Sequence, residues 1–200
     1  MIHFTPMDIE APDTSSEGGN PYKRAKQPQV VRKALLDEAV KLIVSGGLSA
    51  VTVQAVAAAA GVSKGGFLHH FPTKLALIDA VFKDLLDSID SELDRYMAND
   101  TEAAGVFTRA YVKVVLETDW ESSDNPKAAL SIFMLTEPQL RHAWANWFNA
   151  RLDRHDATDR DTRFALVRFA TDGIWLSALS GIDMPDRLEL RDRLLEAAKP

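Results

Sequence analysis

Residues 52–74 constrain the fold most, because they contain two short helical patterns separated by a tight turn. Residues 55–60 are mostly alanine, which predicts a slim helix that can lie close to its neighbours. Gly61 follows this helix and is suited to the positive φ of a helix end. The next helix should end near His70, because Pro72 disfavours helical geometry in the residue before it. Two helices joined in this way form a helix-turn-helix.

The second helix of this motif carries residues that suit contact with DNA. Lys64, His69 and His70 lie on it, and no acidic residue is nearby. Gly65 and Gly66 would each cost a short helix about 1 kcal/mol relative to alanine. Their missing side chains could let the backbone approach a phosphate or a base edge, whereas the simpler explanation is a frayed helix start. The pattern predicts that this helix enters the major groove of DNA.

The net charge of −6 conceals an uneven distribution of charge along the chain. Residues 1–20 carry four acidic groups and no Lys or Arg, whereas residues 21–83 carry nine basic groups against three acidic ones. Residues 84–200 have an excess of acid, with fourteen basic groups against twenty-two acidic ones. A basic segment attached to an acidic body predicts that one end meets a polyanion, although uneven charge without a function would look the same.

Three parts of the chain are expected. Residues 1–27 contain many Pro, Gly and Ser residues and should form a disordered tail. Residues 28–73 should form the helix-turn-helix DNA-binding domain, which opens with a helix at residues 28–45. Residues 74–200 should form a helical ligand-binding and dimerisation domain. A long helix with an apolar stripe at residues 75–96 should lead into it.

The remaining chain reads as helices, with no strand alternation and no internal repeat. These helices are expected at about residues 102–118, 126–135, 138–154, 160–180 and 186–198, with a break at residues 156–159. The predicted fold class is therefore all-α: a three-helix N-terminal domain, a long connecting helix and a C-terminal helical bundle that dimerises.

The predicted dimer interface rests on one helix. Residues 164–179 are apolar almost all round, so this helix needs cover on two sides. One cover is its own bundle. The other is predicted to come from a second subunit, in a four-helix interface that includes the final helix, because helix-turn-helix proteins commonly read paired half-sites. The alternative is a helix buried wholly within one subunit.

Aromatic residues are numerous in the C-terminal part and suggest a ligand site. Such residues more often build a core, but a cavity between helices would use them as walls. Asp172 lies three residues before Trp175 in the most apolar helix, and a buried carboxylate beside a ring could bind a cation. Its alternative role is an intrahelical pair with Arg168. The candidate effector-pocket residues are Phe107, Tyr111, Phe133, Trp144, Trp147, Phe148, Asp172 and Trp175.

Composition disfavours several other functions. The chain has no cysteine, which excludes disulfides, thiol catalysis and cysteine-bound zinc. His142 and His155 show no metal spacing, and neither a phosphate-binding glycine loop nor a nucleophile motif is present. We therefore expect no cofactor, no metal and no catalytic residue. We also expect no signal peptide and no membrane span, because the first residues are acidic and no apolar run reaches about eighteen residues.

The segment from about residue 34 to residue 82 resembles the N-terminal domain of TetR-family transcriptional regulators. The matching residues are Ala39, Gly47, Thr52, Ala57, Ala60, Gly61, Val62, Ser63, Lys64, Gly65, His69, His70, Phe71 and Lys74. The remainder is similar to the family in helix count and length. The chain departs from the family at Leu68, where tyrosine is usual, and at Gly66, where threonine is frequent.

This resemblance implies a cytoplasmic homodimer that binds a palindromic double-stranded DNA operator and is released by an unknown small-molecule effector. It implies DNA contacts by Thr52, Gln54, Lys64, Gly65, Gly66, His69, His70 and Lys74. Thr52 and Lys74 lie at helix starts, where they should position phosphates rather than read bases. Two alternatives stay open: a regulator without an effector that is controlled by a protein partner, and an all-helical enzyme.

Overall fold

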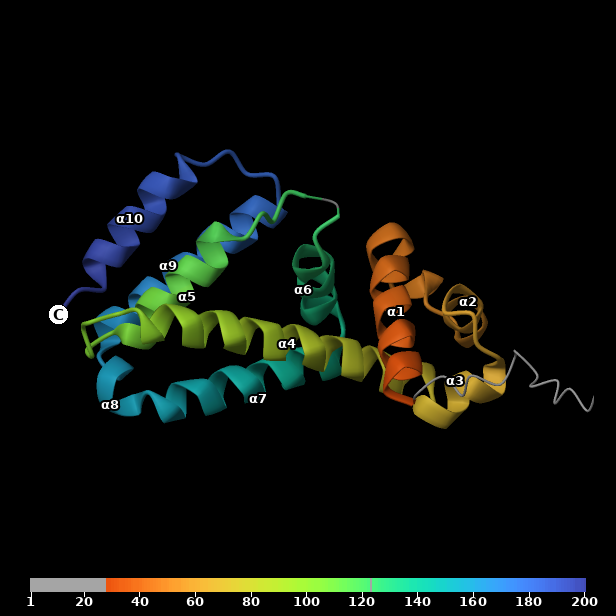
Figure 1. Ribbon diagram of the computed structural model, residues 1–200. Helices are drawn as coiled ribbons and strands as arrows, with labels where there is room; N and C mark the ends of the chain where they lie inside the picture. The colour runs from red at the N-terminus through yellow and green to blue at the C-terminus, as the bar shows by residue number, and fades with distance from the viewer. Residues whose placement is uncertain (1–27, 123) are drawn as a thin grey trace, which may run out of the picture.

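The computed structural model describes residues 28–122 and 124–200, and within these ranges all regular structure is helical. The disordered tail predicted for residues 1–27 lies outside the described residues. The head of the molecule consists of α1 (Pro28–Ala50), α2 (Val53–Ala59) and α3 (Lys64–His70). From the head, α4 (Lys74–Ala98) runs along the rest of the molecule (Figure 1). The predicted all-α architecture with an N-terminal helix-turn-helix is confirmed.

The body comprises α5 (Val106–Glu117), α6 (Pro126–Thr136), α7 (Pro138–Arg154), α8 (Asp156–Asp159), α9 (Thr162–Leu179) and α10 (Arg187–Ala197). Helix α5 is central and packs against α4, α9 and α10, while α6 lies between α7 and the head helix α1. None of the helices in the described ranges is both long enough and apolar enough to cross a membrane.

Local capping explains where the head helices begin and end. The side chains of Thr52, Ser63 and Thr73 each accept a hydrogen bond from the backbone N–H three residues further on, which caps α2, α3 and α4. At the end of α2, Gly61 has φ 63° and the N–H of Val62 donates to the carbonyl of Ala57. This Schellman arrangement produces the tight turn between α2 and α3.

The end of α1 differs slightly from the prediction. Gly47 has φ 69° and ψ −175°, so the helix breaks there as its glycine pair indicates. A further turn then continues to Ala50, beyond the predicted end at residue 45. Its backbone places Val51 in the head core, where it is fully buried.

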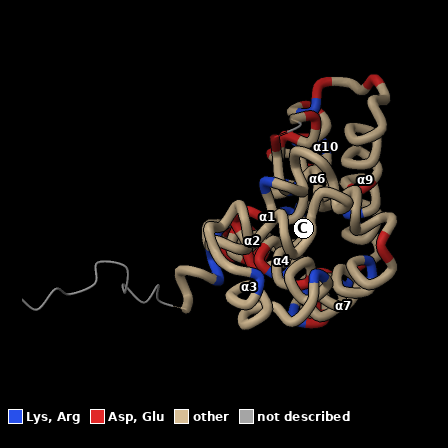
Figure 2. Tube along the Cα trace, turned by 90° about the vertical axis from the view of Figure 1, so that its right-hand side faces the viewer, with Lys and Arg blue, Asp and Glu red and all other residues tan. Residues whose placement is uncertain are grey.

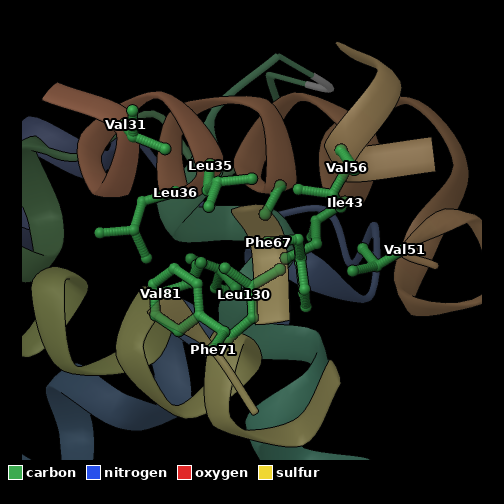
Figure 3. Close-up of a cluster of buried hydrophobic side chains, with 13 residues drawn as sticks. Val31, Leu35, Leu36, Ile43, Val51, Val56, Phe67, Phe71, Val81 and Leu130 are labelled. Atoms are coloured by element: carbon green, nitrogen blue, oxygen red, sulfur yellow. The ribbon is translucent and has the colours of Figure 1, made fainter. Parts of the chain in front are cut away.

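The head has its own apolar core, and one of its members comes from the body. Leu35, Ile43, Val56 and Phe67 are buried together between α1, α2 and α3 (Figure 3). Leu130 of α6 joins this cluster and is 2% exposed. Helix α6 therefore completes the core of the head, although it lies almost sixty residues beyond α3 in the sequence.

Two details of the sequence prediction are wrong. Leu75 was expected to begin the inward stripe of α4, but it is half exposed and Leu77 is buried instead. Residues 156–159 were expected to be a break, but they form the short helix α8. The physical reason is Asp159, whose carboxylate accepts hydrogen bonds from the backbone N–H groups of Phe107 and Thr108 at 3.3 and 2.8 Å. This contact holds α8 against the start of α5 and caps α5.

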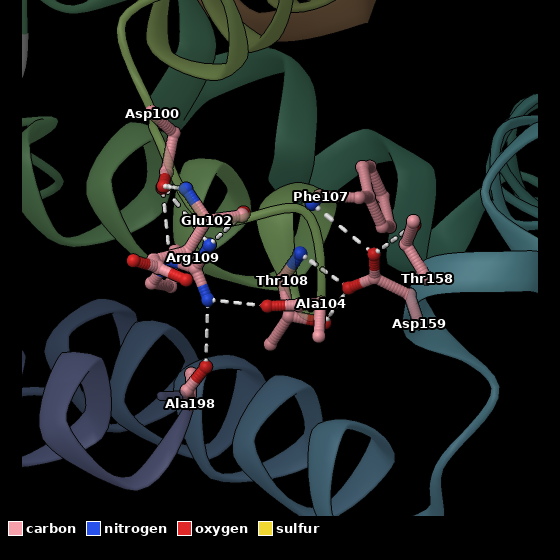
Figure 4. Close-up of polar contacts among 9 residues, drawn as sticks. All are labelled: Asp100, Glu102, Ala104, Phe107, Thr108, Arg109, Thr158, Asp159 and Ala198. Carbon is pink, nitrogen blue, oxygen red and sulfur yellow. Dashed lines mark hydrogen bonds and ion pairs between the residues drawn. The ribbon is translucent and has the colours of Figure 1, made fainter. Parts of the chain in front are cut away.

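A buried arginine joins three parts of the body. Arg109 of α5 makes a bidentate ion pair with Asp100, which follows α4 (Figure 4). Its guanidinium also donates to the carbonyls of Glu102, Ala104 and Ala198. The side chains of Arg109 and Asp100 are only 8% and 11% exposed. This network ties the end of α10 to the loop between α4 and α5.

Candidate DNA-binding surface and effector cavity

Helix α3 presents a polar and glycine-rich face away from the head core. Phe67 is fully buried, whereas Lys64, Gly65, Leu68 and His69 are exposed. At 100° per residue, Leu68 lies between Lys64 and Gly65 on this face. The face lies at the end of the molecule remote from α10 (Figure 1). The arrangement leaves a whole turn of α3 open for contact with another molecule.

The other predicted DNA-contacting residues surround this face. Thr52 and Gln54 are exposed at the start of α2, and the rings of His69 and His70 lie edge to face with centroids 5.2 Å apart. Lys74 differs, because its ammonium group donates to the carbonyl of Leu48 at 2.7 Å. That bond fastens the start of α4 to the end of α1 and leaves two further N–H donors on the same group.

The sequence at this end of the molecule contains a long stretch without acidic residues. No Asp or Glu occurs between Glu38 and Asp79, a span that includes all of α2 and α3. Basic positions lie beside α1 and α3 in Figure 2. A stretch of chain that carries basic groups and no acidic ones favours association with a polyanion.

A cavity of about 280 Å³ lies in the body between α4, α5, α6, α7 and α9. Its walls are mostly apolar and aromatic. They are formed by Phe82, Leu85, Ile89, Tyr111, Val114, Val115, Thr118, Trp120, Lys127, Ser131, Met134, Leu135, Arg141, Trp144, Asp172 and Trp175. This size and lining are typical of a site for a small organic molecule.

The cavity brings together four of the eight candidate pocket residues: Tyr111, Trp144, Asp172 and Trp175. The other four lie elsewhere. Phe107 stacks on His155 with ring centroids 5.4 Å apart, and Phe148 packs against Tyr111 and Trp144. Trp147 packs against the cluster around α4, and Phe133 packs on the head core. These rings support the walls or the head rather than line the cavity.

Trp120 and the lining residues of α4 and α6 were not among the sequence candidates. Trp120 lies just beyond the end of α5, and its indole N–H donates to the carbonyl of Val115 at 2.7 Å. Its ring meets that of Trp175 at 77° with centroids 6.1 Å apart. The sequence offered one indication that Trp120 belongs to the cavity, which is that a single tryptophan lies in the loop after an amphipathic helix.

Asp172 is held by a tyrosine rather than by an arginine. The hydroxyl of Tyr111 donates to its carboxylate. Arg168, the alternative partner, instead donates to Thr108 at 2.6 Å and lies 3.9 Å from Asp159. Burial raises the pKa of Asp172 above its ordinary value, and burial also raises the pKa of Tyr111 well above the usual value for a phenol.

Helix α6 connects the cavity with the head. Ser131 and Met134 line the cavity, whereas Leu130 lies in the head core and Phe133 packs against it. Helix α4 also reaches both regions, because Phe82 and Ile89 line the cavity and Leu77 lies in the head core. Two helices, α4 and α6, therefore contact both the cavity and the head core.

One apolar face of the body is uncovered in the described chain. Leu166, Phe169 and Leu176 of α9 are 64%, 70% and 48% exposed. They follow helical spacing and lie along one side of α9, with Gly173 between Phe169 and Leu176. A side chain at Gly173 would meet no other atom within 4 Å. A stripe of large apolar side chains at this spacing marks a surface for another helix.

A helix-turn-helix head joined to a helical body with an internal cavity defines a class of regulatory proteins that combine a DNA-binding end with a ligand-binding end. The profile described as "Bacterial regulatory proteins, tetR family" matches residues 35–81, and "Tetracyclin repressor-like, C-terminal domain" matches residues 105–199. The chain belongs to the TetR family.

Individual relatives agree with this assignment. The chain is 30% identical over 136 residues to the HTH-type transcriptional repressor KstR2 of Rhodococcus jostii (strain RHA1), a match that covers 68% of this chain and 57% of that repressor. The match to the HTH-type transcriptional regulator RutR of Escherichia coli (strain K12) covers 48% of that regulator, so the chain spans about half the length of these two relatives.

Two solved structures show the same fold. A TetR-family member from Streptomyces coelicolor A3 superposes with a TM-score of 0.67 at 21% identity, over 85% of this chain and 99% of that one. The multidrug binding protein EbrR complexed with malachite green superposes with a TM-score of 0.65 at 20% identity, over 84% of this chain and 98% of that one.

Proposed function

We propose that the protein is a DNA-binding transcriptional repressor that leaves its operator when a small molecule binds in the body. The exposed face of α3, with Lys64 and His69 in a stretch of sequence free of acidic residues, carries the DNA-binding part of this proposal. Thr52, Gln54, Gly65, Gly66, His70 and Lys74 complete the proposed contact set. Because its target would be chromosomal DNA, we also propose that it acts in the cytoplasm.

The proposed repressor is a homodimer that binds a palindromic operator. The exposed stripe of Leu166, Phe169 and Leu176 supports this, because a two-fold axis would pair the stripe with its own copy. Two subunits would place two α3 helices on one side of a duplex, one helical turn apart or a multiple of it. We retain residues 28–73 as the proposed DNA-binding domain and residues 74–200 as the proposed ligand-binding and dimerisation domain.

The cavity supports an effector. A regulator controlled only by a protein partner would be expected to fill its bundle completely, and a cavity of about 280 Å³ runs against that alternative. A protein of the same fold, EbrR, has been solved in complexes with malachite green and with ethidium. The effector would act on DNA binding through α4 and α6. A coupling of about 1–3 kcal/mol would change operator affinity several-fold to about a hundredfold.

Replacing Lys64 by alanine is the experiment that tests DNA binding. An operator would first be selected from random duplexes with the purified protein, and its affinity would be measured over a range of salt concentrations. If each Lys64 neutralises one phosphate, the slope of log K against log salt should become shallower by about 0.9 for each head. The control is Lys199→Ala, which removes the same charge near the end of α10, far from the head.

The control should leave affinity and slope unchanged. Failure to select any duplex would contradict the proposed function. A Lys64→Ala variant with the affinity and salt slope of the unaltered protein would contradict the proposed placement of α3 on DNA.

A further inference from the structure

The chemistry of the cavity wall identifies the kind of molecule that fits it. Five aromatic residues line the cavity, namely Phe82, Tyr111, Trp120, Trp144 and Trp175, and Asp172 is the only carboxylate among the lining residues. Asp172 is partly buried and accepts one hydrogen bond, from the hydroxyl of Tyr111. Its carboxylate therefore has unused acceptor capacity toward the cavity.

The two basic residues of the cavity do not offset Asp172. Lys127 is paired with Glu92, with its ammonium nitrogen 2.5 Å from the Glu92 carboxylate. Arg141 is exposed at the surface and donates to the carbonyl of Leu135. Neither basic residue forms an ion pair with Asp172 in the described chain. The inner wall of the cavity therefore presents one carboxylate among aromatic rings, and the positive charge of Arg168 also acts on that carboxylate.

We propose that the effector cavity binds a hydrophobic organic cation, either a quaternary ammonium ion or a protonated amine. This inference rests on the proposed function, because it names the ligand class of the same effector site. The faces of aromatic rings attract a cation, and the attraction is strongest where water is excluded. A neutral ligand of the same shape would fill the cavity but would leave the carboxylate of Asp172 without a partner, which costs free energy.

The test uses matched probes that differ mainly in charge. Phenyltrimethylammonium is the cation, tert-butylbenzene is its uncharged isostere and benzenesulfonate is an anion of similar size. Binding to the full-length protein would be measured by titration calorimetry and by the fluorescence of the tryptophans that line the cavity. The unaltered protein should bind the cation at least about tenfold more tightly than the neutral isostere.

The Asp172→Asn variant should lose most of this preference, with a fall in cation affinity of about ten- to thirtyfold and little change for tert-butylbenzene. Asp172→Glu should retain the preference, because it keeps the charge. Asp183→Asn is the control, since it removes one exposed carboxylate outside the cavity. Circular dichroism of each variant would establish that it is folded.

Equal affinity for the cation and its neutral isostere, tighter binding of the anion, or no binding of any probe would each overturn the proposed ligand class. Failure of the effector mechanism is a separate result. If the cation binds in the cavity but leaves operator affinity unchanged, the ligand class stands and the proposed release from DNA is wrong.

A second inference comes from an independent feature, the exposed leucine in the middle of the α3 face. Leu68 is 41% exposed, and Lys64, Gly65 and His69 lie around it on the same face. This large apolar side chain does not belong to the apolar core of the head. In the major groove, the apolar group available to such a side chain is the 5-methyl group of thymine.

We infer that Leu68 reads a thymine in each operator half-site through its 5-methyl group, an inference that rests on the proposed DNA binding. Gly65 supports this reading, because its missing side chain would let the backbone beside Leu68 come close to the base edges. Burial of one methyl group gives a modest but measurable preference for thymine over other bases at that position.

Uracil tests this contact, because it pairs as thymine does but lacks the methyl group. Each thymine of the selected operator would be replaced by uracil in turn. One position in each half-site should then weaken binding of the unaltered protein by about fourfold. The Leu68→Ala variant should bind the thymine operator more weakly and should be indifferent to uracil at that position. Ile132→Ala, at an exposed residue of α6, is the control and should keep the full uracil effect.

Tolerance of every uracil by the unaltered protein would overturn the inference, as would an unchanged uracil effect in Leu68→Ala. Failure to select any operator would instead contradict the proposed DNA binding on which the inference rests.

Discussion

Arg109→Met should destabilise the protein by about 3–5 kcal/mol, the range observed when one partner of a buried ion pair is removed. The substitution leaves the carbonyls of Glu102, Ala104 and Ala198 without the donor that Arg109 provides. It also removes the ion pair of Asp100, whose carboxylate keeps only the hydrogen bond from the backbone N–H of Glu102. Chemical denaturation at a fixed protein concentration would measure the loss of unfolding free energy, since the proposed dimerisation would make stability depend on concentration.

Arg160→Met is the matched control, because Arg160 pairs with Asp156 on the surface and its side chain is 79% exposed. That substitution should cost less than about 1 kcal/mol. Comparable losses for the two variants would show that the Arg109 network contributes no more than an exposed pair.

The Arg109 network should also make stability depend on pH. The hydrogen bonds from Arg109 lower the pKa of Asp100 below its ordinary value. A carboxyl group whose pKa is lower in the folded state stabilises the protein fully above the unfolded-state pKa, and this contribution disappears as the pH falls through the folded-state pKa. The stability difference between the unaltered protein and Arg109→Met should therefore shrink in acid.

Phe169→Glu should convert the proposed dimer into a monomer and lower operator affinity by about a hundredfold or more, because the two heads would then bind half-sites separately. The substitution would place two like charges near a two-fold axis on an apolar surface. Sedimentation analysis would measure the molar mass, and titration of the selected operator would measure affinity. Helical content should not change, since Phe169 is 70% exposed within one chain.

Ile132→Glu provides the control for this experiment. It introduces the same charge at an exposed apolar residue of α6 and should leave the molar mass of the protein unchanged. A Phe169→Glu variant that remains dimeric would place the interface elsewhere on the molecule. A monomer that binds the operator as tightly as the dimer would refute the role of paired heads.

The parts of the fold that were predictable from sequence are the parts fixed by neighbouring residues. Thr52 caps α2 through an N–H three residues away, and Gly61 ends the same helix by its own backbone conformation. Pro138 lies at the start of α7, the expected first residue of that helix. Such contacts span a few residues, so a local pattern contains the whole interaction.

Contacts between distant residues were not predictable in this way. Asp159 caps α5 from 51 residues away, and no pattern near residue 159 indicates the partner. Lys74 at the start of α4 remains a proposed phosphate contact, and its hydrogen bond to the carbonyl of Leu48, 26 residues earlier, was not predicted. The aromatic residues of the body indicated a ligand site, whereas which of them face the cavity depends on how five helices pack together.

The place of Leu130 in the head core has a practical consequence for engineering. A chimaeric regulator could be designed by joining α1, α2 and α3 of this protein to the body of another regulator. A junction after α3 would remove Leu130 from the core of the head and expose the apolar side chains that it covers. A working chimaera would need to include α6, or at least Leu130 and its neighbours on the side facing the head, together with α1, α2 and α3.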